Sequence, residues 1–368
     1  MDVHRSSDPG LALTRIGSWI LAIVVFVAVL ELCARVEDRV VWGAPMVGAY
    51  SFDAIFGADS IGWRPRPGGG YRQFSINAYG FRGPEVAPEP GPGTVRVVVL
   101  GASESFGQAE SPGSEYPRAL ETTLTRLQDD ASVHYEVLNA AIPGMSLPRM
   151  HEYFDRWVRR FSPDVAVVYP SPGFYLDDTP PADSIRPRNG GFTHPEGGFR
   201  LRSRLRSALA AFLPDEIETW LKRRGIRRTR EQHEPNWPWT TVPEKRLELY
   251  ETHLEELLRG LQNAGVETFV VTHVSAIDRP LSPEDESLLV GWQRFHPRAD
   301  GHVILEFEEE ANARLRAVAE RVGATVVDAA AELDPEATWF SDHQHFTDLG
   351  AGRMATVIAQ SIKEASVR

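Results

Sequence analysis

Ser103 has the sequence context of a catalytic nucleophile. It follows the apolar run Val95–Leu100 almost directly, with Gly101 between them to permit a tight turn, and a helix is predicted next. A serine at the end of a buried strand, beside the first amides of a helix, can attack a carbonyl carbon in a crevice. It can equally cap the helix, because serine is a preferred N-cap residue. The segment differs from the Gly-x-Ser-x-Gly turn, because Ser105 stands where that turn has its second glycine.

Asp342 and His345 form a second chemical segment, close to the C-terminus and just before the last predicted helix. The carboxylate can accept a hydrogen bond from one imidazole nitrogen of His345, which leaves the other nitrogen to take a proton from Ser103. These three residues therefore predict a catalytic triad. A metal site made of Asp342, His343 and His345 is the alternative, but no further ligand cluster accompanies it. We therefore expect neither a metal nor another cofactor.

A scaffold must bring these distant segments together, and the pattern from residue 94 onward predicts one. Apolar strands alternate with segments of helical period, which is typical of a parallel sheet. The predicted strands are Val95–Leu100, Tyr135–Leu138, Asp164–Tyr169, Glu267–Val274 and Thr325–Asp328, and the predicted helices are Tyr116–Leu127, Pro148–Phe161, Glu244–Leu261, Glu306–Val322 and Gly350–Lys363. This order predicts a three-layer α/β/α sandwich of flavodoxin-like type with a five-stranded parallel sheet. Its ligand crevice should lie at the carboxyl ends of the strands.

The expected domain, residues 94–368, is preceded and interrupted by segments of another kind. Residues 34–93 are rich in Gly and Pro, which predicts a juxtamembrane segment of loops and short strands. Residues 177–243 form a polar insertion, whose part Arg200–Arg230 holds ten basic residues against three acidic ones. Apolar residues recur there on one helical face: Leu201, Leu205, Leu209 and Phe212. We expect an amphipathic helix that is either solvated or in contact with anionic lipid headgroups.

The N-terminus contains a candidate membrane span. Ile16–Leu30 has no charged residue, so residues 1–10 are expected to be a tail and residues 11–33 a transmembrane signal anchor. A spanning helix needs about 20 apolar residues, so Arg15 would reach toward the headgroups. A cleaved signal peptide is the alternative, although Leu32 stands where cleavage requires a small residue. Both readings place the rest of the chain outside the cytoplasm. We therefore expect a single-pass protein with a periplasmic domain.

The composition excludes several other classes of protein. The chain has 368 residues, of which 42% are hydrophobic and 24% charged, which excludes a disulfide-stapled miniprotein, a chain disordered throughout and a polytopic membrane protein. Its net charge of -12 repels nucleic-acid phosphate, so we expect no nucleic-acid partner. With Cys33 as its one cysteine, the chain forms neither an intrachain disulfide nor a cysteine zinc site.

Taken in order, the motifs resemble those of the SGNH, or GDSL, hydrolase superfamily, from about Thr94 to the C-terminus with the insertion between them. The first family block is Gly-Asp-Ser followed by Phe-Gly, and Gly101-Ala102-Ser103 with Phe106-Gly107 is similar to it. The second block contributes a glycine amide, and the segment that ends in Gly144 is similar to that block. The last block, Asp-x-x-His followed by Gly, is similar to Asp342, His345 and Gly350. The segment Asn77–Gly83 resembles the lead-in of membrane-anchored bacterial members.

The resemblance implies that Ser103 is the nucleophile and that the amides of Ser103 and Gly144 form the oxyanion hole. Ala102 replaces the aspartate of the first block, which is outside the triad, so altered turn support is expected. Gly173 stands near the place of the asparagine that donates to the oxyanion. The loss of one such donor costs about 10² to 10³ in turnover. Three nearby side chains are candidates to replace it: Asn77, Asn139 and Ser171.

The expected function is that of a membrane-tethered serine esterase or O-acyltransferase. By analogy with the family, its substrates would be acyl esters, chiefly acetyl esters, of an extracytoplasmic glycan or glycolipid. Hydrolysis and transfer use the same residues, and transfer would fit a membrane acyltransferase as partner. Two alternatives remain open. One is a catalytically impaired glycan-binding or scaffold module, which Gly173 suggests; the other is a lipid esterase, which the basic insertion suggests.

Overall fold

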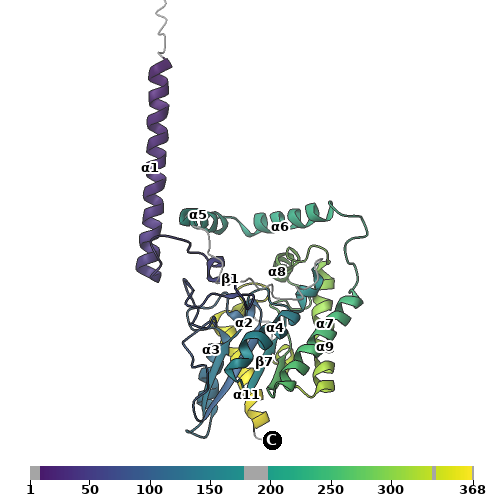
Figure 1. Ribbon diagram of the computed structural model, residues 1–368. Helices are drawn as coiled ribbons and strands as arrows, with labels where there is room; N and C mark the ends of the chain where they lie inside the picture. Colours follow the sequence, from purple (N-terminus) through teal and green to yellow (C-terminus); the bar gives the residue numbers. More distant parts are fainter. Residues whose placement is uncertain (1–8, 178–197, 334–336, 367–368) are drawn as a thin grey trace, which may run out of the picture. The chain divides into compact units, whose positions relative to one another are not determined.

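The computed structural model describes residues 9–177, 198–333 and 337–366 (Figure 1). The chain forms two compact units. The N-terminal unit consists of the described residues up to Ala54 together with residues 198–213, and the larger unit contains the rest. The N-terminal unit carries the long apolar helix, whereas the larger unit carries the sheet and the candidate site.

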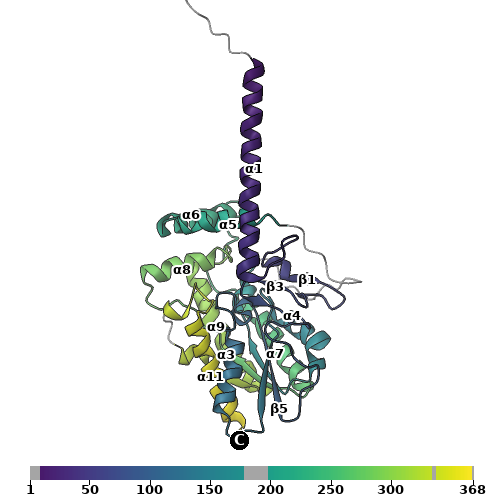
Figure 2. The same cartoon turned by 90° about the vertical axis from the view of Figure 1, so that its left-hand side faces the viewer.

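Helix α1 (Pro9–Trp42) contains the expected membrane anchor and is drawn as a long rod in Figure 2. Its part from Ile16 onward is long and apolar enough to span a membrane. The helix continues through residues 34–42, which the sequence pattern assigned to loops and short strands. The additional turns are stabilised by Arg35, whose Nε donates to Oε1 of Glu31 at 2.7 Å, one helical turn earlier.

Helix α5 (Arg200–Ala211) is the amphipathic helix expected in the insertion, and it packs against α1 within the N-terminal unit. Arg204 donates to Oδ1 of Asp38 at 2.6 Å, and Arg200 donates to Oδ2 of the same residue at 3.4 Å. The side chains of Leu205 and Leu209 are exposed. Arginines of this helix therefore pair with carboxylates of α1, while Leu205 and Leu209 stay accessible.

The larger unit contains a five-stranded parallel sheet in the order β6-β5-β7-β8-β9, which confirms the predicted fold class. The strands are β5 (Thr94–Gly101), β6 (His134–Asn139), β7 (Val165–Tyr169), β8 (Glu267–Val271) and β9 (Thr325–Val327). All residues of β7 are buried, as expected for a strand with helices on both faces. Strand β8 ends three residues before its predicted end at Val274, so His273 lies in the loop that follows.

Helices cover both faces of this sheet (Figure 1). They are α3 (Tyr116–Leu127), α4 (Leu147–Tyr153, continued by a π turn at Phe154–Val158 and a 3-10 turn at Arg159–Phe161), α7 (Glu244–Asn263), α9 (Gly301–Val322) and α11 (Asp348–Ser366). On the face of α3 and α11, the core joins Val97 and Val167 of the sheet to Leu120 and Met354. Helices α4, α7 and α9 pack together on the opposite face.

The larger unit begins at Ile55, so residues 55–93 belong with the sheet and not with a separate juxtamembrane segment. They form two short hairpins, β1 (Phe56–Ala58) with β2 (Trp63–Pro65) and β3 (Gly70–Tyr71) with β4 (Phe74–Ser75), preceded by a 3-10 turn at Asp53–Ile55. The rings of Phe56 and Phe74 each lie 5.6 Å from that of Phe106, and Arg82 donates to the carbonyl of Gly107. These contacts pack the segment against the turn that carries Ser103.

Two helices are not anticipated by the sequence pattern: α6 (Asp215–Arg230) and α8 (Pro283–Gln293). Helix α8 begins with a capping box, in which Ser282 Oγ accepts from the Asp285 amide at 3.1 Å and Asp285 Oδ2 accepts from the Ser282 amide at 2.9 Å. A hydrogen bond of 3.0 Å between Thr219 and Ser287 joins the two helices. The remaining short elements are α2 (Ser103–Phe106), the 3-10 turns Pro172–Leu176 and Ala337–Trp339, and α10 (Ala329–Glu332).

Candidate active site

Ser103 is the first residue of α2, at the carboxyl end of β5. The turn requires Gly101, because a Cβ there would lie 2.0 Å from Ser105 Oγ. Ser105 Oγ in turn accepts a hydrogen bond from the Tyr116 hydroxyl at 2.7 Å. Ala102 is the N-cap residue and provides no side-chain cap. The turn is therefore supported by Ser105 and Tyr116, consistent with the altered support expected from Ala102.

The Ser103 hydroxyl lies on the wall of a cavity of about 300 Å³. The residue is 8% exposed, and its Oγ donates to Oε2 of Glu104 at 3.1 Å. Its amide is the first of α2, and the first amides of a helix have no partner within that helix. Ser103 thus lines the cavity and has an amide that no residue of α2 accepts.

Asp342 and His345 are joined within the loop that precedes α11. Nδ1 of His345 lies 2.7 Å from Oδ2 of Asp342, and the other carboxylate oxygen accepts the amides of His345 at 2.9 Å and Gln344 at 3.0 Å. An antiparallel bridge between Phe340 and Phe346 closes the loop. Among the described residues, Nε2 of His345 is buried and has no hydrogen-bond partner. One ring nitrogen is therefore fixed by the carboxylate, and the other can receive a proton.

Burial and charge act in opposite directions on this pair. Burial alone would raise the pKa of Asp342, but the hydrogen bond and charge of His345 hold it well below its usual range. Burial alone would lower the pKa of His345, but the hydrogen bond to Asp342 and the charge of Glu104 raise it above its usual value. The imidazole of His345 is therefore a stronger base than that of a free histidine.

The 300 Å³ cavity collects every predicted site residue: Ser103 from the end of β5, Gly144 from the loop after β6, and Asp342 and His345 from the loop before α11. Aromatic side chains of Phe174, Trp292 and Phe295 form part of its wall. Ser103 and His345 share no hydrogen bond in the described structure, because the hydroxyl donates to Glu104. Catalytic hydrogen bonds are often longer before substrate binds. The hydroxyl must therefore leave Glu104 to reach His345.

Gly144 has a backbone conformation that favours glycine. Its φ is +74°, in the left-handed region, whereas a Cβ at this position would meet nothing within 4 Å. The constraint therefore comes from the backbone and not from a lack of space. Gly144 lines the same cavity as Ser103, and its role as a main-chain donor, which the family resemblance implies, stays a prediction.

The three side chains considered as replacements near Gly173 have other partners. Asn139 Nδ2 donates to the carbonyl of Ser105 at 3.0 Å, and Asn77 Nδ2 donates to the carbonyl of Pro84 at 2.9 Å. Neither asparagine lines the cavity. Ser171 does line it, but its hydroxyl donates to Glu104. Asn77 and Asn139 therefore stabilise turns, and Ser171 supports Glu104.

A buried network beside Ser103 is absent from the sequence-based prediction. Glu104 Oε1 accepts from Ser171 and lies 3.4 Å from Nε2 of His273. Nδ1 of His273 lies 2.6 Å from Oε1 of Glu308, whose other oxygen accepts from Ser275 at 2.9 Å. The one signal in the sequence is a glutamate directly after Ser103; His273 lies inside the predicted strand Glu267–Val274, so the pattern does not place it in a loop.

The charges of this network identify it as a support and not as the catalytic base. Burial alone would raise the pKa of Glu104, but the hydrogen bond and charge of His273 lower it to about 2. Burial alone would lower the pKa of His273, but Glu104 and Glu308 raise it to about 9. Near neutral pH, Glu104 is a carboxylate too weakly basic to deprotonate Ser103. His345, whose pKa is raised and whose Nε2 has no partner among the described residues, remains the candidate base.

His343 forms part of the cavity wall. Burial lowers its pKa to about 4, so its ring is neutral, and it stacks on Trp292 with 5.2 Å between ring centroids. Its Nδ1 lies 3.9 Å from Asp342 Oδ1. The described part of the chain contains no group of three or more His, Cys, Asp or Glu residues arranged to hold a metal ion.

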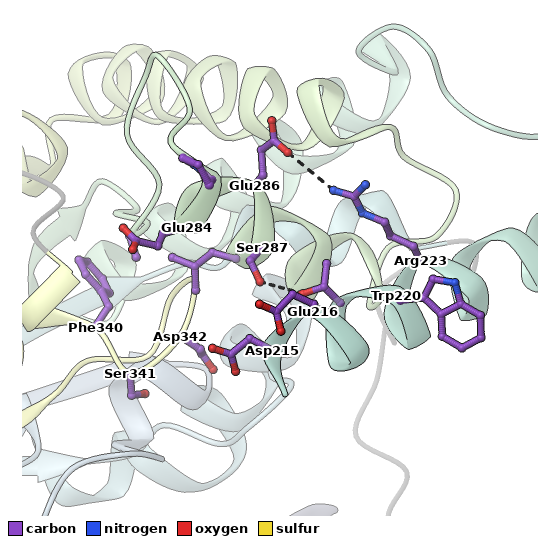
Figure 3. A pocket seen from close by; sticks show the side chains of 14 residues that line it. Asp215, Glu216, Trp220, Arg223, Glu284, Glu286, Ser287, Phe340, Ser341 and Asp342 are labelled. Atoms are coloured by element: carbon purple, nitrogen blue, oxygen red, sulfur yellow. Dashed lines mark hydrogen bonds and ion pairs between the residues drawn. The ribbon is translucent and has the colours of Figure 1, made fainter. Parts of the chain in front are cut away.

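A second cavity, of about 710 Å³, shares the lining residue Asp342 with the first. Figure 3 shows the residues that line this second cavity. Helices α6 and α8 form its walls, with the aromatic side chains of Trp220 and Phe340. Its carboxylate-bearing residues are Asp215, Glu216, Glu284, Glu286 and Asp342. Of these, Glu286 pairs with Arg223 at 3.7 Å. The cavity thus combines aromatic surfaces with many hydrogen-bond acceptors.

Comparison with known proteins yields similar solved structures. No protein-family model matches the sequence, and no curated protein matches it. The chain is similar to the lipase/acylhydrolase of Enterococcus faecalis at 12% identity and a TM-score of 0.43, over 74% of this chain and 96% of that one. It is similar to an acetylxylan esterase of Geobacillus stearothermophilus at 12% identity and a TM-score of 0.42, over 73% and 94% of the two chains.

A GDSL-like lipase from Bacteroides thetaiotaomicron is similar at 12% identity and a TM-score of 0.39, over 73% of this chain and 88% of that one. With TM-scores below 0.5 and 12% identity, these solved structures assign no role to any side chain of this chain. The role of each side chain is therefore argued from the geometry of this chain alone.

Proposed function

We propose that the protein is a membrane-tethered esterase or O-acyltransferase of the SGNH type. The observation that carries the proposal is one cavity lined by Ser103, Gly144 and the Asp342–His345 pair. A hydroxyl group, a base held by a carboxylate, and main-chain donors are the groups that acyl transfer requires.

The reaction begins when Ser103 Oγ attacks the carbonyl carbon of a bound ester and its proton passes to Nε2 of His345. The carbonyl oxygen becomes an oxyanion, which the amides of Ser103 and Gly144 stabilise. The intermediate then expels the alcohol of the ester, which takes the proton from His345 and leaves an acyl group on Ser103. Water or a sugar hydroxyl attacks that acyl group while His345 accepts its proton. The bond between Ser103 Oγ and the acyl carbon then breaks, and Oγ takes the proton from His345, which releases the acid or new ester and regenerates Ser103.

The size and lining of the two cavities support small acyl groups on a glycan or glycolipid. The 300 Å³ cavity has room for an acetyl ester beside aromatic walls. The adjoining 710 Å³ cavity offers Trp220, on which an apolar sugar face can stack, and carboxylates that can accept hydrogen bonds from sugar hydroxyls. An acceptor sugar bound there would be next to Asp342, close to the acyl-enzyme.

Membrane tethering is assigned to α1. Its apolar part can cross the bilayer, and the basic residues that precede it would stay on the cytoplasmic side. The larger unit would then lie in the periplasm, where acylated surface glycans are accessible.

Two other functions have specific observations in their favour. Gly173 lacks a side-chain donor and the Ser103 hydroxyl is bonded to Glu104, which would suit a glycan-binding module without activity. The exposed Leu205 and Leu209 of α5, which packs on α1, would suit an esterase that acts on lipid.

The decisive experiment is covalent labelling of the full-length chain in detergent with a fluorophosphonate probe. We expect an adduct on the wild type, no adduct on Ser103→Ala, and an unchanged adduct on the matched control Ser132→Ala, an exposed serine. The lack of a Ser103-dependent adduct would favour the binding module. Turnover of p-nitrophenyl acetate against a long-chain ester, with and without an acceptor glycan, then separates lipid esterase, small-acyl esterase and transferase.

A further inference from the structure

Gly173 faces two side chains, Trp292 of helix α8 and His296 just beyond the end of that helix. A Cβ built on Gly173 would lie 3.0 Å from Nε2 of His296 and 3.5 Å from Nε1 of Trp292. Both residues line the cavity that contains Ser103. A side chain at residue 173 would therefore be crowded by the His296 ring and would lie in contact with the Trp292 indole nitrogen.

Trp292 brings an unused hydrogen-bond donor to this wall. The residue is 2% exposed, and an indole N–H is a donor only. A buried indole N–H usually has an acceptor. No acceptor for it lies among the described residues, although Trp292 lines the cavity. The residue is thus buried, its N–H group has no partner among the described residues, and it adjoins the cavity in which an acyl group would bind.

The indole is held firmly in this place. His343 stacks on its ring with 5.2 Å between centroids, at an interplanar angle of 27°. The capping box at Ser282 and Asp285 fixes the start of α8. Beyond its end, Nδ1 of His296 lies 2.7 Å from Asp177 Oδ1. A donor that needs no rearrangement is what stabilisation of a developing oxyanion demands.

We propose that the Trp292 indole N–H is the side-chain donor of the oxyanion hole, in addition to the amides of Ser103 and Gly144. This inference rests on the proposed function, because it concerns the oxyanion formed when Ser103 attacks an ester. The N–H donates a hydrogen bond to that oxygen as negative charge develops on it, and no bond to Trp292 forms or breaks. Helix α8 thus replaces the donor that the loop after β7 lacks.

The test compares two replacements of Trp292 in the full-length chain. Trp292→Phe removes the N–H and part of the ring, whereas 3-benzothienylalanine at position 292 keeps the bicyclic shape and has sulfur in place of the N–H. We expect both to lower kcat for p-nitrophenyl acetate by about 10² to 10³ with little change in KM. The affinity for an aryl trifluoromethyl ketone, which forms a tetrahedral adduct with Ser103, should fall by a similar factor.

Trp157→Phe is the matched control, because the Trp157 N–H donates to the carbonyl of Tyr79 at 2.9 Å and the residue is outside the cavity. Its kcat should equal that of the wild type. If Trp292→Phe lowers kcat but 3-benzothienylalanine does not, Trp292 acts by packing and the inference is wrong. Unchanged kcat in both variants also overturns it. If the wild type shows no Ser103-dependent turnover, the proposed function fails, and the inference fails with it.

Discussion

Oε1 of Glu104 lies 3.4 Å from Nε2 of His273, and each side chain is 1% exposed. The first residue follows Ser103 directly, and the second lies just beyond β8, so this contact ties the turn of the nucleophile to another strand of the sheet. Because the pKa of Glu104 is lowered to about 2 and that of His273 raised to about 9, both groups are charged near neutral pH. Removing one partner would leave the other charge buried.

Replacement of His273 should therefore destabilise the fold. In His273→Ala the buried carboxylates of Glu104 and Glu308 lose the cation between them, and we expect the free energy of unfolding to fall by about 3 to 5 kcal/mol. Urea unfolding of the full-length chain measures it. His134→Ala, at an exposed histidine of β6, is the control and should stay close to the wild type. Equal losses in the two variants would contradict an ion pair at His273.

The same pair predicts how stability depends on pH. The folded-state pKa of His273, about 9, is above its unfolded value, so its contribution is fully present below pH 6.5 and is lost as the pH rises through 9. We expect the free energy of unfolding to fall over this range by up to about 3 kcal/mol. Glu104 acts in the opposite sense, because its stabilisation is present above pH 4.5 and is lost as the pH falls toward 2.

The measurement is urea unfolding at pH 6.5 and pH 9.5 for the wild type and for His273→Gln. Other titrating groups affect both proteins alike, so the difference between the two pH dependences isolates His273. The variant should lose less stability between the two pH values than the wild type does. Parallel pH dependences would show that His273 is not the titrating group.

Most of the fold follows from the sequence because its strands are short apolar runs bounded by turn residues. The run Val95–Leu100, for example, falls within β5, which spans Thr94–Gly101. Helix α8 escapes prediction because its apolar residues do not recur with helical spacing, and Leu288, Leu289 and Val290 are consecutive. The capping box at Ser282 is the local signal that could have located it.

The candidate site is predictable only where its parts lie close together in the chain. Asp342 and His345 are three residues apart, so one loop can join them, and the structure does so. Glu104 and His273 are 169 positions apart, and no pattern in a single sequence pairs them. Trp292 is equally hidden, because an aromatic residue within a short helix is most often part of the core. The groups that surround Ser103 therefore become visible only in the folded chain.

Activity should depend on pH through His345. The imidazole must be neutral to accept the proton of Ser103, and Asp342 raises its pKa, so kcat/KM should rise with pH around a midpoint above that of an ordinary histidine. In Asp342→Asn we expect the midpoint to move to lower pH and kcat to fall by about 10⁴, because the tautomer is no longer fixed.

The profile is measured with p-nitrophenyl acetate from pH 5 to pH 9. Asp278→Asn, at an exposed aspartate outside the cavity, should keep the wild-type midpoint. A midpoint that stays in place in Asp342→Asn would mean that another group controls the rate.

Placing an asparagine at position 173, as in the family block, should lower both the stability and the activity of the protein. In Gly173→Asn the new Cβ would lie 3.0 Å from Nε2 of His296, and that ring is held by Asp177 at 2.7 Å. We expect a loss of about 1 to 3 kcal/mol in the free energy of unfolding, as for other overpacked sites, and a lower kcat because α8 is displaced from the cavity.

The double variant Gly173→Asn/His296→Ala separates overcrowding from other effects of the new side chain. Removal of the imidazole opens the space that the asparagine needs. The stability loss of the double variant should therefore be smaller than the sum of the losses of the two single variants. Urea unfolding of the wild type, the two single variants and the double variant provides this double-mutant cycle. A Gly173→Asn variant with higher kcat than the wild type would show that the loop after β7 can supply the donor, and that helix α8 does not exclude it.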